Sequence, residues 1–379
     1  MPIPLEVEKG TVVFCRVSIF VTVFGAVLSS GPANASAAAV APGGIAPALG
    51  AVHEAPASLK EMRRWNVAAA HGDARAENML ARSALVLHDY ARGVAWARKS
   101  AAQGYAPGEA TLGLCYLLGS GVPLNRALAL RWLRLAAAQG YGPAELEIGV
   151  LYWDGWGVPH DDAKAAQWIK TAAGRANPIA QYDLGYLYRN GIGVPQNYRK
   201  AVAWYRKSAM QGDPLGESGM GDLFVLGKGV PRDYAKAFFW YREAAAQGNA
   251  DAENGIGVLY DNGLAVHRNY RKAMGYYRKA AAGGYAAAMR NIGMLYLYGH
   301  GVAQNFPAAE AWFQRAIAAG DTGAKADLTW IRRAEAENLL SWVALAAVVT
   351  GAIWWLRRRL RRSSSNGPRI DSKTGLLRP

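Results

Sequence analysis

Residues 180–212 read AQYDLGYLYRNGIGVPQNYRKAVAWYRKSAMQG, and this stretch decides the fold. Ala180, Leu184, Leu187 and Tyr188 stand at positions i, i+4, i+7 and i+8. Residues with that spacing lie on one face of an α-helix. The first half of the stretch therefore predicts an amphipathic helix.

A loop and a second helix follow. Gly191 is placed to end the first helix, because glycine adopts the left-handed conformation at little cost. Gly193 permits another tight bend, and Pro195 prevents the helix from continuing. Asn197 is a good helix cap, so a second helix is predicted over 198–211.

Small residues in this stretch predict close packing of the two helices. Gly185 and Ala201 lack bulk where the helices would cross, so the axes can approach closely. Trp204, which lies on the apolar stripe of the second helix beside Tyr205, is expected to fill the space between neighbouring units.

The same pattern recurs every 36 residues. A glycine column comprises Gly113, Gly149, Gly185, Gly221, Gly257 and Gly293, and an aromatic column comprises Trp96, Trp132, Trp168, Trp204, Trp240, Tyr276 and Trp312. One helical pair cannot bury its apolar face alone, so several must stack. The predicted fold is an all-α, α/α solenoid of helical hairpins.

This pattern resembles the Sel1-like repeat, a relative of the tetratricopeptide repeat. Residues 180–212 carry nearly all of the A-x-x-x-L-G-x-L-Y-x-x-G-x-G-V and D/N-x-x-K-A-x-x-W-Y-x-x-A-A-x-x-G signature. The resemblance covers about 68–320. It implies a right-handed superhelix with a concave groove that serves as a protein-interaction scaffold.

Residues 59–104 are predicted to form a divergent N-terminal repeat or cap, because they lack the Gly-x-Gly loop. Six 36-residue repeats are expected over 105–320. The fifth of these, which is the sixth unit when the divergent one is counted, has Ala265 in place of the second loop glycine. A C-terminal capping helix is expected over 321–338.

The N-terminus has the pattern of a secretory signal. Lys9 and Arg16 precede an apolar run, and the A-x-A sequence ending at Ala35 follows it, so 1–35 is predicted to be a cleaved signal peptide. An uncleaved anchor is the alternative. Residues 36–58, rich in Ala, Gly and Pro, are expected to form a flexible linker.

The C-terminus contains the better candidate for a membrane span. Residues 339–356 are 18 residues without charge, flanked by tryptophans and followed by a basic tail over 357–379, expected to be disordered. A buried core helix is the alternative. Because basic segments stay inside, a single-pass protein of the bacterial inner membrane is predicted, with periplasmic repeats and a cytoplasmic tail. An endoplasmic-reticulum lumenal location is a second possibility.

Charge and composition exclude several classes of function. The chain of 379 residues is 51% hydrophobic, which excludes wholesale disorder. Its net charge is +15, but the tail from Arg357 onward contributes eight basic residues and one acidic residue. The remaining excess is mild for so long a stretch, so nucleic acid is not predicted as a partner.

No catalytic, metal or cofactor site is predicted. Cys115 alone lies in the repeats, on an apolar helix, whereas the cysteine-rich hydrolase-like branch of the family has paired cysteines in each repeat. The histidines do not pair at ligand spacing, and the Asp161 beside His160 occupies a capping position. An enzyme is therefore not expected.

Five residues are predicted to form a partner-binding groove. They are aromatic or arginine side chains in or after the first helices of the third and fourth units, the types that dominate binding hot spots: Trp153, Trp156, Tyr182, Tyr186 and Arg189. The alternative is that they fill gaps between adjacent units.

These features lead to a membrane-tethered scaffold as the leading hypothesis, with another protein or peptide segment as partner and the bilayer contacted through 339–356. A second hypothesis is carbohydrate binding in polysaccharide export, with Trp153, Trp156 and Tyr182 stacking on sugars. Basic residues on the second helices, among them Arg206 and Lys279, suggest an anionic polysaccharide or lipid surface, or simply solvated helix faces.

Overall fold

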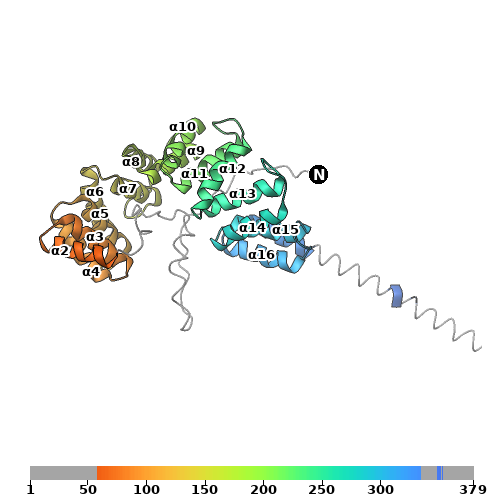
Figure 1. The fold of residues 1–379 in the computed structure, drawn as a ribbon, viewed down its shortest axis with the longest axis horizontal. Helices are drawn as coiled ribbons and strands as arrows, with labels where there is room; N and C mark the ends of the chain where they lie inside the picture. Colours follow the sequence, from red (N-terminus) through yellow and green to blue (C-terminus); the bar gives the residue numbers. More distant parts are fainter. Residues whose placement is uncertain (1–57, 334–347, 351, 353–379) are drawn as a thin grey trace, which may run out of the picture. The chain divides into compact units, whose positions relative to one another are not determined.

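The computed structural model describes residues 58–333, 348–350 and 352, and within these residues the chain is helical with no strand. Figure 1 shows the helices following one another as antiparallel pairs. An initial helix precedes the pairs, and the first three pairs follow it: α2 (Leu59–Ala70), α3 (Ala74–Val86), α4 (Tyr90–Ala102), α5 (Ala106–Leu118), α6 (Arg126–Ala138), α7 (Gly142–Asp154) and α8 (Asp162–Gly174).

The later pairs keep the predicted period of 36 residues. They are α9 (Pro178–Asn190), α10 (Tyr198–Ala209), α11 (Pro214–Leu226), α12 (Tyr234–Ala246), α13 (Ala250–Asn262), α14 (Tyr270–Ala282), α15 (Ala286–Tyr298) and α16 (Phe306–Ala318). The predicted start of the second helix at Tyr198 is confirmed, and Asn197 caps it by accepting a hydrogen bond from the Lys200 amide.

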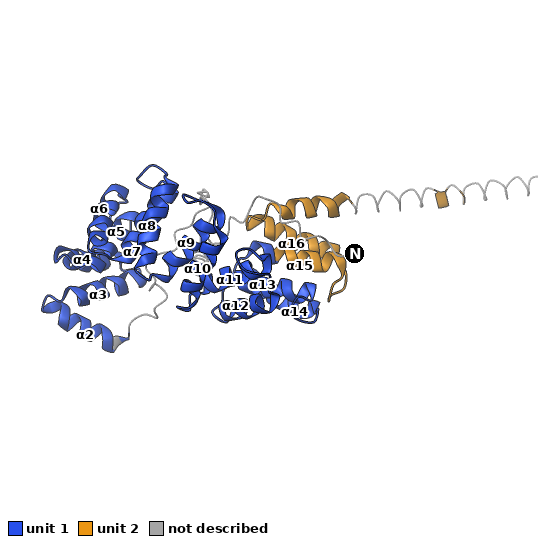
Figure 2. Cartoon of the chain, turned by 90° about the horizontal axis from the view of Figure 1, so that it is seen from above, with its two compact units in different colours: residues 1–288 blue, residues 289–379 orange. Residues whose placement is uncertain are grey.

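The chain divides into two compact units, 1–288 and 289–379 (Figure 2). In the second unit, Phe313, Ala324 and Ile331 are fully buried together, and Arg290 forms an ion pair with Asp327 at 2.5 Å. Residues 323–333 are helical up to the end of that described stretch and lie within the segment 321–338 predicted as a capping helix.

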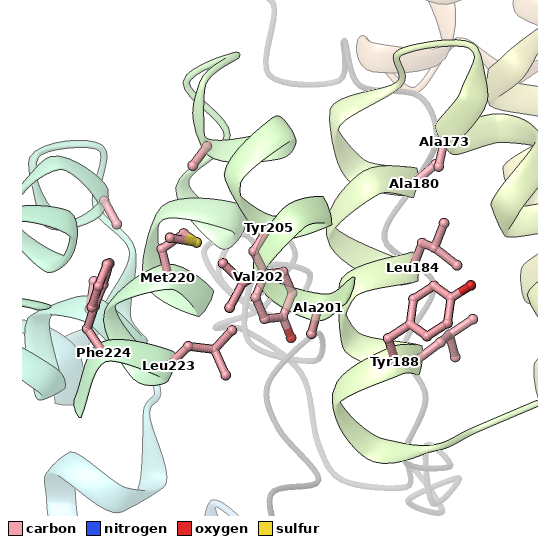
Figure 3. Close-up of a cluster of buried hydrophobic side chains, with 14 of the residues drawn as sticks. Ala173, Ala180, Leu184, Tyr188, Ala201, Val202, Tyr205, Met220, Leu223 and Phe224 are labelled. Carbon is pink, nitrogen blue, oxygen red and sulfur yellow. The ribbon is translucent and has the colours of Figure 1, made fainter. Parts of the chain in front are cut away.

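From α5 onward, each first helix packs the glycine of the 36-residue column against a large side chain of the second helix. A Cβ added to Gly185 would lie 2.5 Å from Cδ1 of Tyr205, and one added to Gly221 would lie 2.5 Å from Cδ1 of Tyr241. Tyr205 also contacts Gly219 of the next repeat, so its ring fits between two glycines. Figure 3 shows this ring, fully buried, between α9 and α11.

This packing corrects one prediction. Tyr205, not Trp204, fills the space between neighbouring units; Trp204 is only half-buried, with the Lys207 ammonium 3.9 Å from its ring centroid. At Gly185 the nearest atoms to an added Cβ belong to the Tyr205 ring, so this glycine makes room for that ring. Both Trp204 and Tyr205 lie on the wide apolar stripe of the second helix, so the sequence pattern did not indicate which of them fills this space.

The second glycine of each inter-helix loop meets the preceding repeat. A Cβ on Gly229 would lie 2.5 Å from the carbonyl oxygen of Tyr198, and one on Gly121 would lie 2.5 Å from that of Tyr90. Ala265 occupies the equivalent position with a φ of 59°, in the left-handed region that disfavours side chains. The first repeat has no such loop, and its first helix starts 32 residues before α5 instead of 36.

The two helices of each repeat form different layers. In the first unit, α9 contacts α11 and α11 contacts α13, whereas consecutive second helices show no comparably extensive contact in the described residues. From α9 to α13 the first helices are therefore the more closely spaced layer, as expected for the inner side of a solenoid.

Several predictions fall mainly outside the described residues. They are the signal peptide 1–35, nearly all of the linker 36–58, most of the span 339–356 and the tail 357–379. Among the residues that the structure describes, no helix has both the length and the apolar character needed to cross a bilayer.

Candidate functional site

One face of the first helices is half-buried along its whole length on α9 and α13. It consists of the second, fifth, ninth and twelfth residues of each helix, which lie on one side at helical spacing. We call this face, on α7, α9, α11 and α13, the inner stripe: Pro143, Leu146, Val150 and Trp153; Ile179, Tyr182, Tyr186 and Arg189; Leu215, Ser218, Asp222 and Val225; Asp251, Asn254, Val258 and Asp261.

The inner stripe changes character along the array. On α7 its central residues, Leu146 and Val150, are aliphatic and buried. From Trp153 onward the stripe includes aromatic and charged residues among aliphatic and polar ones, and its members on α9 and α13 are all half-buried. Four of the five residues predicted for a groove lie on this stripe, at the point where it becomes accessible.

Aromatic side chains join two repeats at this point. The rings of Trp153 on α7 and Tyr186 on α9 lie with centroids 5.9 Å apart, tilted by 35°. Tyr182 stacks on Tyr205 of α10 at 5.4 Å. Such ring pairs are held in place by their neighbours and still present an edge to solvent when half-buried. Trp153 and Tyr186 therefore form a rigid aromatic pair across a repeat boundary.

An ion pair continues the stripe. Arg189 Nη1 donates to Asp222 Oδ2 at 2.7 Å, and both side chains are mostly covered, with exposures of 16% and 25%. Tyr241 donates its hydroxyl to the other oxygen of Asp222 at 2.8 Å. Burial works to lower the pKa of Arg189, but Asp222 and Tyr205 outweigh it and raise that pKa, so the guanidinium stays charged.

A third set of polar contacts lies one repeat further on. Ser218 Oγ donates to Asp251 Oδ2 at 2.6 Å, and Tyr285 donates to Asp251 Oδ1 at 2.5 Å. Burial, and then the negative charge of Asp222, raise the pKa of Asp251. The inner stripe thus carries a line of fixed donors and acceptors beside the aromatic pair.

Trp156 does not join the other four residues. It lies in the loop after α7, packs against the apolar cluster of the second and third repeats, and has the Arg126 guanidinium 5.4 Å from its ring centroid. Trp153 faces the following repeat instead. The structure therefore does not assemble Trp153, Trp156 and Tyr182 into a single platform.

Cys115 and His160, the residues considered for catalytic or metal-binding chemistry, are not members of the inner stripe. Burial raises the pKa of Cys115 to about 11, so the thiol is protonated at neutral pH. His160 Nδ1 lies against the Trp153 carbonyl, and its Nε2 is 3.3 Å from Asp162. Within the described residues, no three His, Cys, Asp or Glu side chains are grouped as metal ligands would be.

Sequence reasoning missed Asp222, Tyr241, Ser218 and Asp251. The available signal was a spacing of 33 residues, one repeat less one helical turn, which joins Trp153 to Tyr186, Arg189 to Asp222, and Ser218 to Asp251. This spacing brings the twelfth residue of one first helix to the ninth of the next, and the fifth to the second.

A family model for the Sel1 repeat matches seven segments, which together make up more than half of the chain: 74–105, 107–141, 142–177, 178–213, 214–249, 250–285 and 286–321. The chain belongs to the Sel1 repeat family. The segment 74–105, predicted as part of a divergent cap, thus counts as the first of seven repeats. Sel1 repeat proteins generally mediate protein–protein interaction and are generally non-enzymatic.

Solved structures agree with this assignment. The chain is 30% identical to c5321, a protective antigen of uropathogenic Escherichia coli strains, over 71% of this chain and 67% of that one, with a TM-score of 0.53. It is 26% identical to a Sel1 repeat protein from Oxalobacter formigenes, over 63% and 96% of the two chains, with a TM-score of 0.60. No curated protein matches this Sel1 repeat chain.

Proposed function

We propose that this Sel1 repeat protein is a binding scaffold whose inner stripe takes a segment of another protein between α7 and α13. The observation that carries the proposal is the change along the stripe, from buried aliphatic residues to the half-buried Trp153–Tyr186 pair and the Arg189–Asp222 ion pair. Aromatic and arginine side chains concentrate binding energy at protein interfaces.

The packing beneath the stripe supports this role. Tyr205 and Tyr241 are buried between glycines of consecutive first helices, which fixes the spacing of α9, α11 and α13. A groove with fixed walls binds a segment without the cost of ordering its own side chains. The site is therefore suited to recognition, and no reaction at it is proposed.

The charges of the stripe favour a segment with basic side chains. On α11 and α13 the stripe carries Asp222, Asp251 and Asp261, and only Arg189 on α9 offsets them. A partner lysine or arginine would lie near these carboxylates while an apolar side chain contacts Trp153 and Tyr186. Charge complementarity of this kind mainly determines specificity and association rate.

Photo-crosslinking in cells tests the proposal. A photoreactive amino acid replaces Tyr186 on the inner stripe and, as the matched control, Ala203, which is exposed on α10. A discrete crosslinked protein at position 186 that is absent at position 203 is expected, and it should weaken when Arg189→Ala is added. Equal products at both positions, or none at position 186, would contradict the groove.

We further propose that the scaffold is tethered to the bacterial inner membrane through 339–356 and displays its repeats in the periplasm. The uncharged run and the basic tail that follows it support this topology. A reporter that functions only in the cytoplasm should be active when it is fused after Pro379. Activity of an export-dependent reporter at that position would reverse the orientation.

A further inference from the structure

The two helix layers of the first unit carry opposite charge. The second helices α4, α6, α8, α10, α12 and α14 contain 18 basic side chains and two acidic ones, Asp162 and Glu243. The first helices from α3 to α13 contain eleven acidic side chains and three basic ones. The outer layer therefore has a strong positive field of its own.

The basic residues are densest on α10 and α14. Each of these helices carries two Arg-Lys pairs at the same positions and no acidic residue: Arg199, Lys200, Arg206 and Lys207 on one, Arg271, Lys272, Arg278 and Lys279 on the other. All eight side chains are exposed. Lys207 and Lys279 lie over the rings of Trp204 and Tyr276, with Nζ 3.9 Å and 5.4 Å from the ring centroids.

An aromatic ring protrudes from the helix between them. Phe239 on α12 is 48% exposed, although it lies in a layer of basic residues. The equivalent positions on the neighbouring second helices are Ala203 and Gly275, which are too small to cover it. Along its own helix, Lys236 and Arg242 lie one turn away on either side, with the Arg242 guanidinium 6.0 Å from the ring centroid.

We propose that this outer patch, Phe239 with the basic residues of α10, α12 and α14, docks onto an anionic lipid bilayer. Basic side chains are attracted to anionic headgroups, and a single exposed aromatic ring enters the apolar boundary below them. This surface lies on the opposite layer from the inner stripe, so the proposal does not rest on the groove.

Two features favour a bilayer over other anionic partners. A soluble polyanion would account for the basic residues but not for the exposed phenylalanine. The core of a protein interface is depleted in lysine, whereas each of the three helices presents at least one exposed lysine here. A bilayer surface accommodates both the ring and the surrounding cations, and it needs no pocket.

The test uses the full chain with an environment-sensitive fluorophore on Ala203→Cys, next to Phe239, in a Cys15→Ser background. Cys115 is buried and is not expected to react. The control carries the label on Val67→Cys, a residue of α2 that is 62% exposed. Attachment through the apolar run 339–356 alone would leave both labels in water.

On vesicles of phosphatidylcholine with phosphatidylglycerol, the label at 203 should shift to the blue and the label at 67 should not. The shift should be weak on pure phosphatidylcholine and should be lost in about 0.5 M salt, which screens exposed charges. Equal shifts at both positions, equal shifts on neutral vesicles, or no shift would overturn the proposal. A shift with soluble polyglutamate or an oligonucleotide but not with vesicles would also overturn it, in favour of a polymer.

Variants localise the effect. Arg206→Glu with Arg271→Glu should lower the apparent partition coefficient at least about tenfold, because both side chains are exposed on the patch. Arg63→Glu with Arg75→Glu makes the same change in net charge on α2 and α3. This control variant should change the apparent partition coefficient less than about twofold. Phe239→Ala should lower it about tenfold through lost apolar burial. Equal losses from the two charge reversals would contradict a local patch.

Discussion

The second and third repeats have the same backbone arrangement as the fourth to sixth repeats but a different interior. In the former, the side chains packed against the glycine column are Leu133 and Ile169. In the latter they are tyrosines, among them Tyr205 and Tyr241. The inner stripe changes at the same boundary, from buried aliphatic residues to half-buried aromatic and charged ones.

The comparison shows how a half-buried aromatic and polar face can be built on an unchanged helical hairpin. A tyrosine in the second helix reaches between two first helices. The hydroxyl of Tyr241 also donates a hydrogen bond to the Asp222 carboxylate on the stripe. Leucine and isoleucine at the same position offer no hydroxyl, so the early repeats have no means of fixing a polar group there. The tyrosine region therefore gains polar contacts that its interior holds in place.

Gly221→Ala should produce the largest loss of stability. Its Cβ would lie 2.5 Å from the Tyr241 ring, whereas the Cβ of Gly113→Ala would lie 3.1 Å from the flexible Leu133 side chain and 3.2 Å from the Ala129 carbonyl oxygen. We expect Gly221→Ala to lower the free energy of unfolding by about 3 kcal/mol through overpacking. Gly113→Ala should be close to neutral, because alanine gains about 1 kcal/mol of helix propensity. Denaturant titration checks both, and similar losses would remove the distinction between the regions.

Tyr241→Phe tests the hydroxyl contribution. It removes the hydrogen bond to Asp222 while keeping the ring between its two glycines. A loss of about 1.5 kcal/mol in the free energy of unfolding is expected, since the acceptor is charged and mostly covered. Tyr116→Phe is the control from the early repeats, where the hydroxyl only accepts a 3.5 Å contact from exposed Arg98. An equally large loss of stability in Tyr116→Phe would contradict a particular contribution from the Tyr241–Asp222 hydrogen bond.

Ala265→Gly should stabilise the sixth repeat. Ala265 has a φ of 59°, where glycine is the favoured residue, so the substitution should raise the free energy of unfolding by about 1 kcal/mol. The reverse change, Gly229→Ala, should destabilise the fifth repeat because its Cβ would also meet the Tyr198 carbonyl. Thermal unfolding of both variants measures whether each substitution raises or lowers stability. A destabilised Ala265→Gly protein would be inconsistent with backbone strain at Ala265.

The smallest expected effect is a pH dependence at Asp251. Burial raises the pKa of this carboxyl in the folded state above its unfolded value of about 3.9. The folded state therefore binds the proton more tightly, and this group's contribution to stability falls as pH rises from that value through the raised pKa. The difference in unfolding free energy between wild type and Asp251→Asn should change over that window. A difference that stays flat with pH would exclude the shift.

Much of this fold follows from the sequence, because the same pattern recurs in seven repeats and each occurrence supports the same pair of helices. The cap at Asn197 and the loop glycine Gly191 each have the role that their spacing predicts. The choice of Tyr205 over Trp204 did not follow, since both lie on one broad apolar stripe and only three-dimensional packing against Gly185 separates them.

The candidate site was only partly predictable for a related reason. Residue type was enough to select Trp153, Tyr182, Tyr186 and Arg189, which do lie on one face. Their partners sit in the next repeat at a spacing of 33, so pairing depends on the offset between adjacent first helices. Trp156 lies in the loop, as expected, where no helical face fixes its direction, and in the structure its ring lies next to Arg126.

The most direct test of the central claim is the affinity of the full chain for the protein that crosslinks at position 186. Binding should weaken at least tenfold, about 1.4 kcal/mol, in Trp153→Ala with Tyr186→Ala, and should be unchanged in Phe239→Ala, which alters an exposed aromatic ring on the other layer. Unchanged affinity in the double variant, or an equal loss in both proteins, would contradict a partner-binding inner stripe.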